Sequence, residues 1–261
     1  MNARQKKILD MLRDQALVDI ETLLAKTHVS PATIRRDLQS LEESGHIERF
    51  HGGAKLSRKN HFELSFERRA QINIKQKTYI ADIAASFINS GEAVLLGAGT
   101  TTLYIARALA QQSKKVFIVT NNLIVVQEAA NFPNLRLSLL GGNLDYANME
   151  SIGPTAHENL STHVVDKVFI GVNALDPRFG ALSIYEANAY LYRSMAKIAR
   201  DVFIVADSSK FEAEASHVAV PIHELNHLIT DPKANPRTVA QFCQQGVRVH
   251  GLGQSERNVE I

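Results

Sequence analysis

From residue 77 onward the chain alternates short apolar runs with amphipathic segments, and this alternation constrains its fold more than any other feature. The apolar runs end in polar or glycine-containing turns and lie at residues 93–96, 116–119, 135–140, 168–172, 202–206 and 228–229. Segments with helical spacing lie between most of them, for example at 80–88, 103–109 and 187–199. Strands that alternate with helices predict an α/β fold with a doubly wound, mostly parallel sheet. Ligands of such sheets bind at the carboxyl ends of the strands.

The N-terminal part has a different pattern, which predicts three short helices and a hairpin. Asp19 is a suitable N-cap for the second helix. Ser30 and Pro31 begin the third helix, because serine suits the N-cap and proline suits the first helical position, where an N–H is not needed. Residues 47–50 and 54–56 are predicted to form the hairpin.

Between these two patterns lies a highly polar segment with no sustained apolar period, which we expect to be a linker. The last eight residues are expected to form a flexible tail. The expected parts are a winged helix-turn-helix domain at 1–57, the linker at 58–76, an α/β ligand-binding domain at 77–253 and the tail at 254–261.

Charge is unevenly distributed along the 261 residues. Residues 1–77 have 15 basic and 10 acidic side chains, net +5, whereas the remainder has 14 and 17, net −3. A basic N-terminal part followed by a slightly acidic remainder indicates a polyanion-binding module joined to a second domain.

The single cysteine, Cys243, excludes an intramolecular disulfide and a cysteine-cluster metal site. The charged N-terminus and the lack of about 18 consecutive apolar residues predict a cytosolic protein without a membrane segment.

The third predicted helix has the residue types of a helix that reads DNA. We take Ile34, Leu38 and Leu41 as the buried stripe of this helix. A rotation of about 100° per residue then places Ala32, Arg36 and Gln39 on the opposite face, with Thr33 and Arg35 beside them. Arginine pairs with guanine, glutamine pairs with adenine, and alanine or threonine contacts the thymine methyl group. The candidate DNA-contacting residues, with two from the hairpin, are Ser30, Ala32, Thr33, Arg35, Arg36, Gln39, Arg49 and His51.

The alternative interpretation is a generic three-helix module in which Arg35 and Arg36 are solvated surface charges. The ordered combination of a capped Ser-Pro start, the tetrapeptide RRDL, Gly45 and a basic hairpin favours DNA binding.

Residues 33–54, TIRRDLQSLEESGHIERFHGGA, resemble the winged helix-turn-helix signature of the DeoR family of bacterial sugar-metabolism repressors. The resemblance covers nearly the whole chain, because VTNN, LLGGNL, FIGVNAL and ADSSKF follow in the family's order. It implies a repressor of a carbohydrate-utilisation operon that is released from DNA by a phosphorylated sugar. It also implies a C-terminal domain similar to sugar-phosphate isomerases. A homodimer or higher oligomer is expected, because helix-turn-helix modules usually read paired half-sites on double-stranded DNA.

A glycine-rich turn at residues 97–102, GAGTTT, leads from the apolar run at 93–96 into a helix, and this arrangement is favourable for binding an anion. Glycine allows close approach of the backbone, and a helix N-terminus presents unpaired N–H groups. The turn is not a dinucleotide fingerprint, because Thr102 replaces the third glycine, and it is not a P-loop, because no GK[ST] follows. The alternative is a tight turn with threonine capping. Lys210 is a second candidate ligand, and its alternative is a surface lysine beside a helix cap.

The resemblance favours the ligand-binding interpretation, because the isomerases' phosphate loop corresponds to residues 97–102. The candidate effector-binding residues are Gly97, Ala98, Gly99, Thr100, Thr101, Thr102, Asn121, Gly141, Gly142, Asn173, Glu186 and Lys210. For the turn residues among them, a role in backbone geometry alone is the alternative. Glu186, Asn188 and Tyr190 are candidates for sugar selectivity, with an ordinary helix face as the alternative.

A competing function is that of a sugar-phosphate isomerase that carries a DNA-binding module. Such an enzyme needs a general base, and the similar isomerases have an acidic residue where this chain has Asn173, which cannot abstract a proton. Glu186 or Asp207 is the alternative base, but no sequence pattern marks either residue for this role. We therefore expect a regulator and not an enzyme, with no cofactor and no metal.

Overall fold

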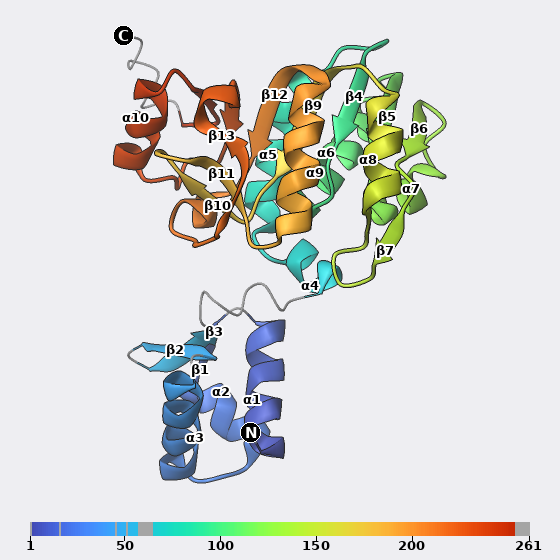
Figure 1. Cartoon of the computed structure of the whole chain (residues 1–261). Coiled ribbons are helices and arrows are strands. Elements are labelled where there is room, and N and C mark those ends of the chain that lie inside the picture. The colour runs from blue at the N-terminus through green and yellow to red at the C-terminus, as the bar shows by residue number, and fades with distance from the viewer. Residues whose placement is uncertain (1, 16, 45, 51, 57–64, 254–261) are drawn as a thin grey trace. The chain divides into compact units, whose positions relative to one another are not determined.

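The computed structural model describes residues 2–15, 17–44, 46–50, 52–56 and 65–253, which belong to two compact units (Figure 1). The units are Met1–Ile72 and Asn73–Ile261, so their boundary falls inside the segment that we expected to be a linker. Gly45, His51 and the expected tail at 254–261 lie outside the described residues. Among the described residues, no helix has the length and apolar character needed to cross a membrane.

The first unit is a winged helix-turn-helix, as predicted. A three-stranded antiparallel sheet of order β1-β3-β2 accompanies three helices, and a short fourth helix follows. The bounds are α1 (Ala3–Asp14), β1 (Leu17–Asp19), α2 (Ile20–Thr27), α3 (Pro31–Glu43), β2 (Ile47–Phe50), β3 (Gly53–Leu56) and α4 (Phe66–Gln71).

Both predicted N-caps of the first unit are confirmed. The side chain of Asp19 accepts a hydrogen bond from the N–H of Thr22, and the side chain of Ser30 accepts one from the N–H of Thr33. Between the two helices His28 adopts the left-handed conformation, with φ of 55°, which turns the chain from α2 into α3. The amphipathic faces of α1, α2 and α3 then bury one apolar cluster, whose largest fully buried members are Ile8, Leu12, Leu23, Ile34, Leu38, Leu41 and Ile47.

The segment expected to be a linker, residues 58–76, contains helical structure. Helix α4 falls within it, and α5 (Ile74–Ser86) begins before residue 77. Helix α4 was not predicted because the segment is highly polar overall. It nevertheless has a short apolar face, since Phe66 and Ala70 are one helical turn apart and both are buried.

The second unit contains the predicted parallel sheet. Its seven strands are in the order β15-β14-β12-β9-β4-β5-β6, and every neighbouring pair is parallel. The strand bounds are β4 (Ala93–Leu96), β5 (Val116–Thr120), β6 (Leu135–Leu139), β9 (Val165–Gly171), β12 (Ala199–Val205), β14 (His227–Ile229) and β15 (Arg248–His250). The first six were predicted. Strand β15 was missed, because an Arg-Val-His segment has no apolar run.

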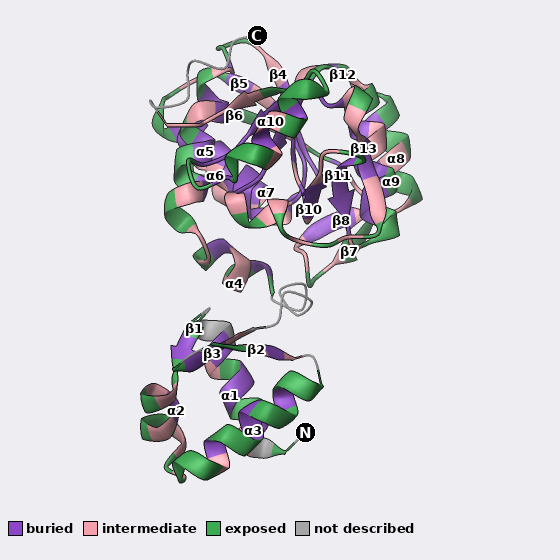
Figure 2. Cartoon of the chain, turned by 90° about the vertical axis from the view of Figure 1, so that its left-hand side faces the viewer, coloured by how far each residue is buried: buried purple, intermediate pink, exposed green. Residues whose placement is uncertain are grey.

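Helices cover both faces of this sheet, α5 and α6 (Thr100–Gln111) one face, and α8 (Pro154–Ser161) and α9 (Glu186–Lys197) the other (Figure 1). Figure 2 shows the buried strands between the partly exposed helices. Helix α9 ends two residues earlier than predicted, because Ala199 already belongs to β12. Two further helices are α7 (Leu123–Ala129) and α10 (Pro236–Gln244), and two short 3-10 helices are η2 (Ser208–Phe211) and η3 (Ile222–Glu224). The other strands form the hairpin of β7 (Asn143–Asp145) and β8 (Glu150–Ile152) and a small antiparallel sheet of β10 (Ala174–Asp176), β11 (Gly180–Ser183) and β13 (His217–Pro221).

The order of the strands indicates where a ligand is expected to bind. The chain runs from β4 outward to β5 and β6, and then returns to place β9 on the other side of β4. At such a switch point, the loops that follow the two central strands run in opposite directions and leave a ligand-binding crevice at the carboxyl edge. The turn at 97–99 and Asn173 follow these strands, so both lie at this edge.

A buried histidine of β14 and a partly buried histidine of β15 form a hydrogen-bonded pair at the edge of the sheet. Nδ1 of His227 lies 3.0 Å from Nε2 of His250. His227 stacks on Phe203 with ring centroids 4.3 Å apart, and the ring of Phe87 lies 4.8 Å from that of His250. Burial lowers the pKa of both imidazoles, and the positive charge of Arg248 lowers each further.

This pair predicts that the protein loses stability in mild acid. Below about pH 6.5 the unfolded histidines bind protons that the folded pair takes up only at lower pH, so the free energy of unfolding falls as the pH falls. Urea unfolding at about pH 7.5 and about pH 5.5 measures the effect. His250→Gln should reduce the pH dependence. The control His223→Gln, which changes an exposed histidine, should leave it unchanged, and an equal change in both variants would contradict the prediction.

Candidate functional site

Helix α3 presents to solvent the side chains that were expected to read DNA. Ala32, Arg35, Arg36 and Gln39 are exposed, Thr33 is partly exposed, and Ile34, Leu38 and Leu41 are buried. Within the described part of the chain, neither Arg35 nor Arg36 forms an ion pair. The amide of Gln39 donates to Glu43 at 2.9 Å, an exposed contact that a base edge can replace.

Arg49 on the hairpin is held against α3. Its backbone N–H donates to Oε1 of Glu42 at 3.0 Å, and its Nη1 lies 3.8 Å from Oε2 of the same carboxylate. The contact fixes the hairpin relative to α3, and the exposed guanidinium keeps donors for a phosphate. His51, the other hairpin candidate, lies outside the described residues.

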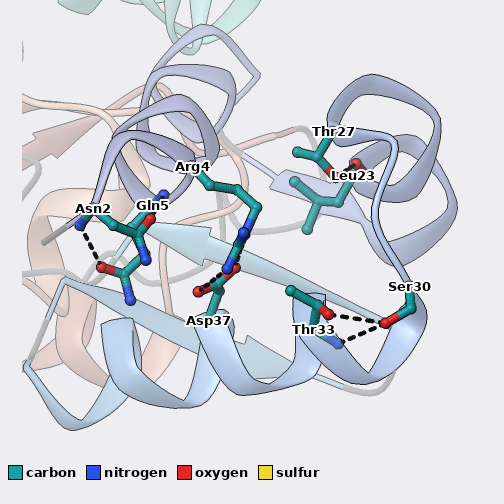
Figure 3. Close-up of polar contacts among 8 residues, drawn as sticks. All are labelled: Asn2, Arg4, Gln5, Leu23, Thr27, Ser30, Thr33 and Asp37. Atoms are coloured by element: carbon teal, nitrogen blue, oxygen red, sulfur yellow. Dashed lines mark hydrogen bonds and ion pairs between the residues drawn. The ribbon is translucent and has the colours of Figure 1, made fainter.

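An ion pair that was not predicted from the sequence joins α1 to α3. Figure 3 shows the guanidinium of Arg4 reaching the carboxylate of Asp37, with Nε paired to Oδ2 and Nη2 lying 3.2 Å from Oδ1. Asp37 is buried beside Ile34 and Leu41, so its charge points into the unit and away from the exposed arginines. The signal was present, because residue 37 falls on the predicted buried stripe at 34, 38 and 41.

In the second unit the turn after β4 is fixed by hydrogen bonds from three other elements. The N–H of Gly97 donates to the carbonyl of Phe169 at 2.9 Å, and the N–H of Ala98 donates to Oδ1 of Asn121 at 2.7 Å. The hydroxyl of Tyr192 donates to the carbonyl of Ala98 at 3.2 Å. Gly99 has φ of 148°, a conformation that favours glycine.

The fixed turn leaves the N-terminus of α6 uncapped. Thr102 turns its hydroxyl back to the carbonyls of Gly97 and Gly99, at 2.6 and 2.9 Å. The N–H groups of Gly99, Thr100 and Thr101 donate to no group in the described residues, and no side chain caps the helix. Three unpaired donors at the positive end of a 12-residue helix form a suitable site for an anion.

Asn121 was expected to line the effector pocket, but it is fully buried and its amide is used internally. Besides accepting from Ala98, it donates to Oε2 of Glu150 at 3.0 Å and to the carbonyl of Ser151 at 3.2 Å. The neighbouring Asn122 donates to the carbonyl of Gly99 at 3.0 Å. These two asparagines support the turn.

The other candidates at strand ends have different surroundings. Gly142 has φ of 125°, and a Cβ there would lie 2.4 Å from the carbonyl oxygen of Ile152, so its glycine is required by backbone geometry. Gly141 is half-buried. Asn173 accepts from the N–H of Ile184 at 3.2 Å, and Glu186 is exposed in the first turn of α9.

A charged cluster lies at the carboxyl end of β12. Asp207 is buried and accepts hydrogen bonds from Asn73 at 3.1 Å and from the N–H of Ser209 at 3.0 Å. Burial opposes ionisation, but the charges of Lys210 and Lys77 and the hydrogen bonds from Ser209 hold the pKa of Asp207 below its ordinary value. Lys77 is itself buried. Its role was not predicted from the sequence, although it lies on the buried stripe of α5 with Ile80, Ala81 and Ala84.

No group of three histidine, cysteine or acidic side chains in the described residues is placed to hold a metal ion.

Comparison with known proteins gives a consistent result. A model described as the DeoR-like helix-turn-helix domain matches residues 4–60, and one described as the DeoR C terminal sensor domain matches residues 72–232. A putative aga operon transcriptional repressor of Escherichia coli O157:H7 is 31% identical over 96% of this chain and 94% of that protein. The lactose phosphotransferase system repressor of Lactococcus lactis subsp. lactis is 30% identical over 92% of this chain and 95% of that protein. Ribose 5 phosphate isomerase A from Neisseria gonorrhoeae aligns with 53% of each chain, at 16% identity and a TM-score of 0.39.

A winged helix-turn-helix whose third helix exposes Arg35, Arg36 and Gln39, joined in one chain to a sensor domain, defines a DNA-binding transcriptional regulator. The chain belongs to the DeoR family, so the resemblance drawn from its sequence motifs is confirmed.

The exposed position of Arg36 leads to a test of how it contacts DNA. Arg36→Ala should weaken specific binding by about 1–3 kcal/mol, because a bidentate arginine–guanine contact contributes that much discrimination. Titrations with operator and with random DNA, at one salt concentration, separate base reading from phosphate contact. An equal loss on both DNAs would make Arg36 a phosphate contact and contradict the prediction.

Proposed function

We propose that the protein is a cytoplasmic repressor of a carbohydrate-utilisation operon, and that a phosphorylated sugar or sugar derivative releases it from its operator. The observation that carries the proposal is the set of N–H groups of Gly99, Thr100 and Thr101, which have no acceptor among the described residues and lie at the switch point of the parallel sheet. A phosphate group matches these donors in charge and in hydrogen-bonding capacity.

The cluster beyond β12 supports a phosphorylated ligand. Lys77 and Lys210 place two positive charges about the carboxylate of Asp207, at the same carboxyl edge of the sheet as the turn at 97–99. The names of two similar proteins, the aga operon repressor and the lactose phosphotransferase system repressor, support repression and a sugar-related ligand.

Release by a ligand requires that the ligand bind differently to the DNA-competent and DNA-incompetent arrangements of the protein. A coupling free energy of about 1–3 kcal/mol is sufficient for regulation. We infer a homodimer or higher oligomer on the DNA, because two half-sites multiply the affinity of one exposed helix.

The carboxylates near the edge support a regulator over an isomerase. An isomerase needs a general base within hydrogen-bond reach of a carbon-bound proton. Glu150 and Asp207 are buried and already accept hydrogen bonds, and Asn173 is an amide. We propose on this basis that the protein is not an enzyme.

The effector assignment predicts selective stabilisation by phosphorylated sugars. Thermal unfolding of the full chain is measured against a panel of sugars, each with and without a phosphate. A ligand present at 100 times its dissociation constant adds about 2.7 kcal/mol to the stability of the folded state. Stabilisation confined to phosphorylated members is expected. Equal stabilisation by the unphosphorylated sugars would contradict a phosphate site at residues 97–102.

Lys210→Ala separates the two roles of the chain. We expect operator affinity to be unchanged, and about tenfold more of the stabilising sugar phosphate to be needed for release, because one charged hydrogen bond to the phosphate is lost. The measurement is a DNA-binding titration at increasing ligand concentration. Lys197→Ala is the control, since Lys197 is an exposed lysine at the far end of α9, next to the start of β12. Loss of operator binding in Lys210→Ala alone would show that the roles are not separate.

A further inference from the structure

Glu150 is a buried carboxylate that neither the sequence motifs nor the proposed ligand contacts explain. It lies on β8, where it is 1% exposed. Its two oxygens accept from two different side-chain amides: Oε2 from Asn121 at 3.0 Å and Oε1 from Asn188 at 2.7 Å. Burial of a carboxylate is costly, so its hydrogen bonds indicate a specific role for this group.

These hydrogen bonds are part of a closed ring around the turn that follows β4. Asn121 accepts from the N–H of Ala98, and the carbonyl of Ala98 accepts from Tyr192. Tyr192 and Asn188 lie on α9 four residues apart, which is one helical turn, so the ring closes through α9. The two peptide groups that flank Ala98 are thereby tied to the end of β5, to β8 and to α9.

The hydrogen-bonding capacities explain why an acceptor is needed at position 150. Asn121 cannot reverse its amide, because its oxygen already accepts from Ala98, so its NH₂ group must face Glu150. A carboxylate accepts hydrogen bonds only, and Glu150 therefore satisfies Asn121 and Asn188 together. The orientation of Asn121 in turn keeps the N–H of Ala98 occupied, while those of Gly99 and Thr100 remain open.

We propose that Glu150 is a positioning residue for the effector site. It orients Asn121, and through it holds the Ala98 peptide in the conformation that presents the unpaired N–H groups at the start of α6. The inference rests on the proposed function of residues 97–102 as an anion-binding turn. The useful property of Glu150 is its acceptor geometry and not its negative charge, because a negative charge close to an anion site opposes binding.

Three variants separate acceptor geometry from charge and from general disturbance of the hairpin. Glu150→Met has a similar volume but no comparable acceptor, so it opens the ring. Glu150→Gln should preserve the ring, because its carbonyl accepts from Asn121 and its NH₂ donates to Asn188 once that amide has turned over. Asp145→Asn is the matched control, since Asp145 pairs with Glu150 in the β7–β8 register, but among the described residues its side chain bonds only within its own turn.

The first readout is hydrogen exchange at the Ala98 amide of the full chain, without ligand. Relative to the unchanged protein, exchange should be about tenfold or more faster in Glu150→Met, because a buried hydrogen bond to a charged group is lost. It should be unchanged in Glu150→Gln and in Asp145→Asn. Unchanged exchange in Glu150→Met, or equally fast exchange in Glu150→Gln, would overturn the proposal.

The second readout is stabilisation by inorganic phosphate in thermal unfolding. Glu150→Met should lose it, whereas Glu150→Gln should keep it or increase it. If the unchanged protein is not stabilised by phosphate, the effector assignment fails, while the exchange measurement still decides the role of Glu150. If Glu150→Met does not fold, Glu150→Ala takes its place, because it also removes the acceptor of the Asn121 amide. Exchange at Ala98 as slow as in the control would then overturn the proposal.

Discussion

Burial of both faces of the parallel sheet is the constraint on which the second unit depends. A parallel sheet must be covered by helices on both sides, and α5 and α6 on one face and α8 and α9 on the other provide this cover. The chain must then return over the sheet after each strand, so the polar residues that follow the strands gather at one edge. The reversal of strand order between β4 and β9 leaves room there for a ligand.

Buried polar groups in both units orient the backbone or side chains that carry function. Arg4 pairs with Asp37 on the inner side of α3. The carboxylate of Asp37 is therefore kept away from the outer side of the helix, where Arg35 and Arg36 are exposed. Glu150 orients Asn121, which fixes the turn before α6. In each case a charge that would be unfavourable in an apolar interior is satisfied by donors from another element.

The location of the candidate effector site was predicted from the sequence, but the roles of several of its residues were not. Residues 97–102 were identified because glycines followed by threonines at a strand-to-helix turn are a local pattern. Asn121 was expected to face the ligand, but it is turned inward, because its orientation is set by Glu150, 29 residues away along the chain. Lys77 was missed for the same kind of reason, since its significance depends on Asp207, which belongs to a distant strand end.

The sequence by itself determined three local features: the alternation that gives a parallel sheet, the caps at Asp19 and Ser30, and the outward side of α3. These features depend on residues within one or two helical turns or strand repeats, so local propensity and periodicity suffice. The tertiary structure alone decided that Asp37 pairs with Arg4 and that Glu150 closes a ring through α9. Such contacts join residues far apart in the chain, and their geometry exists only after the elements have packed.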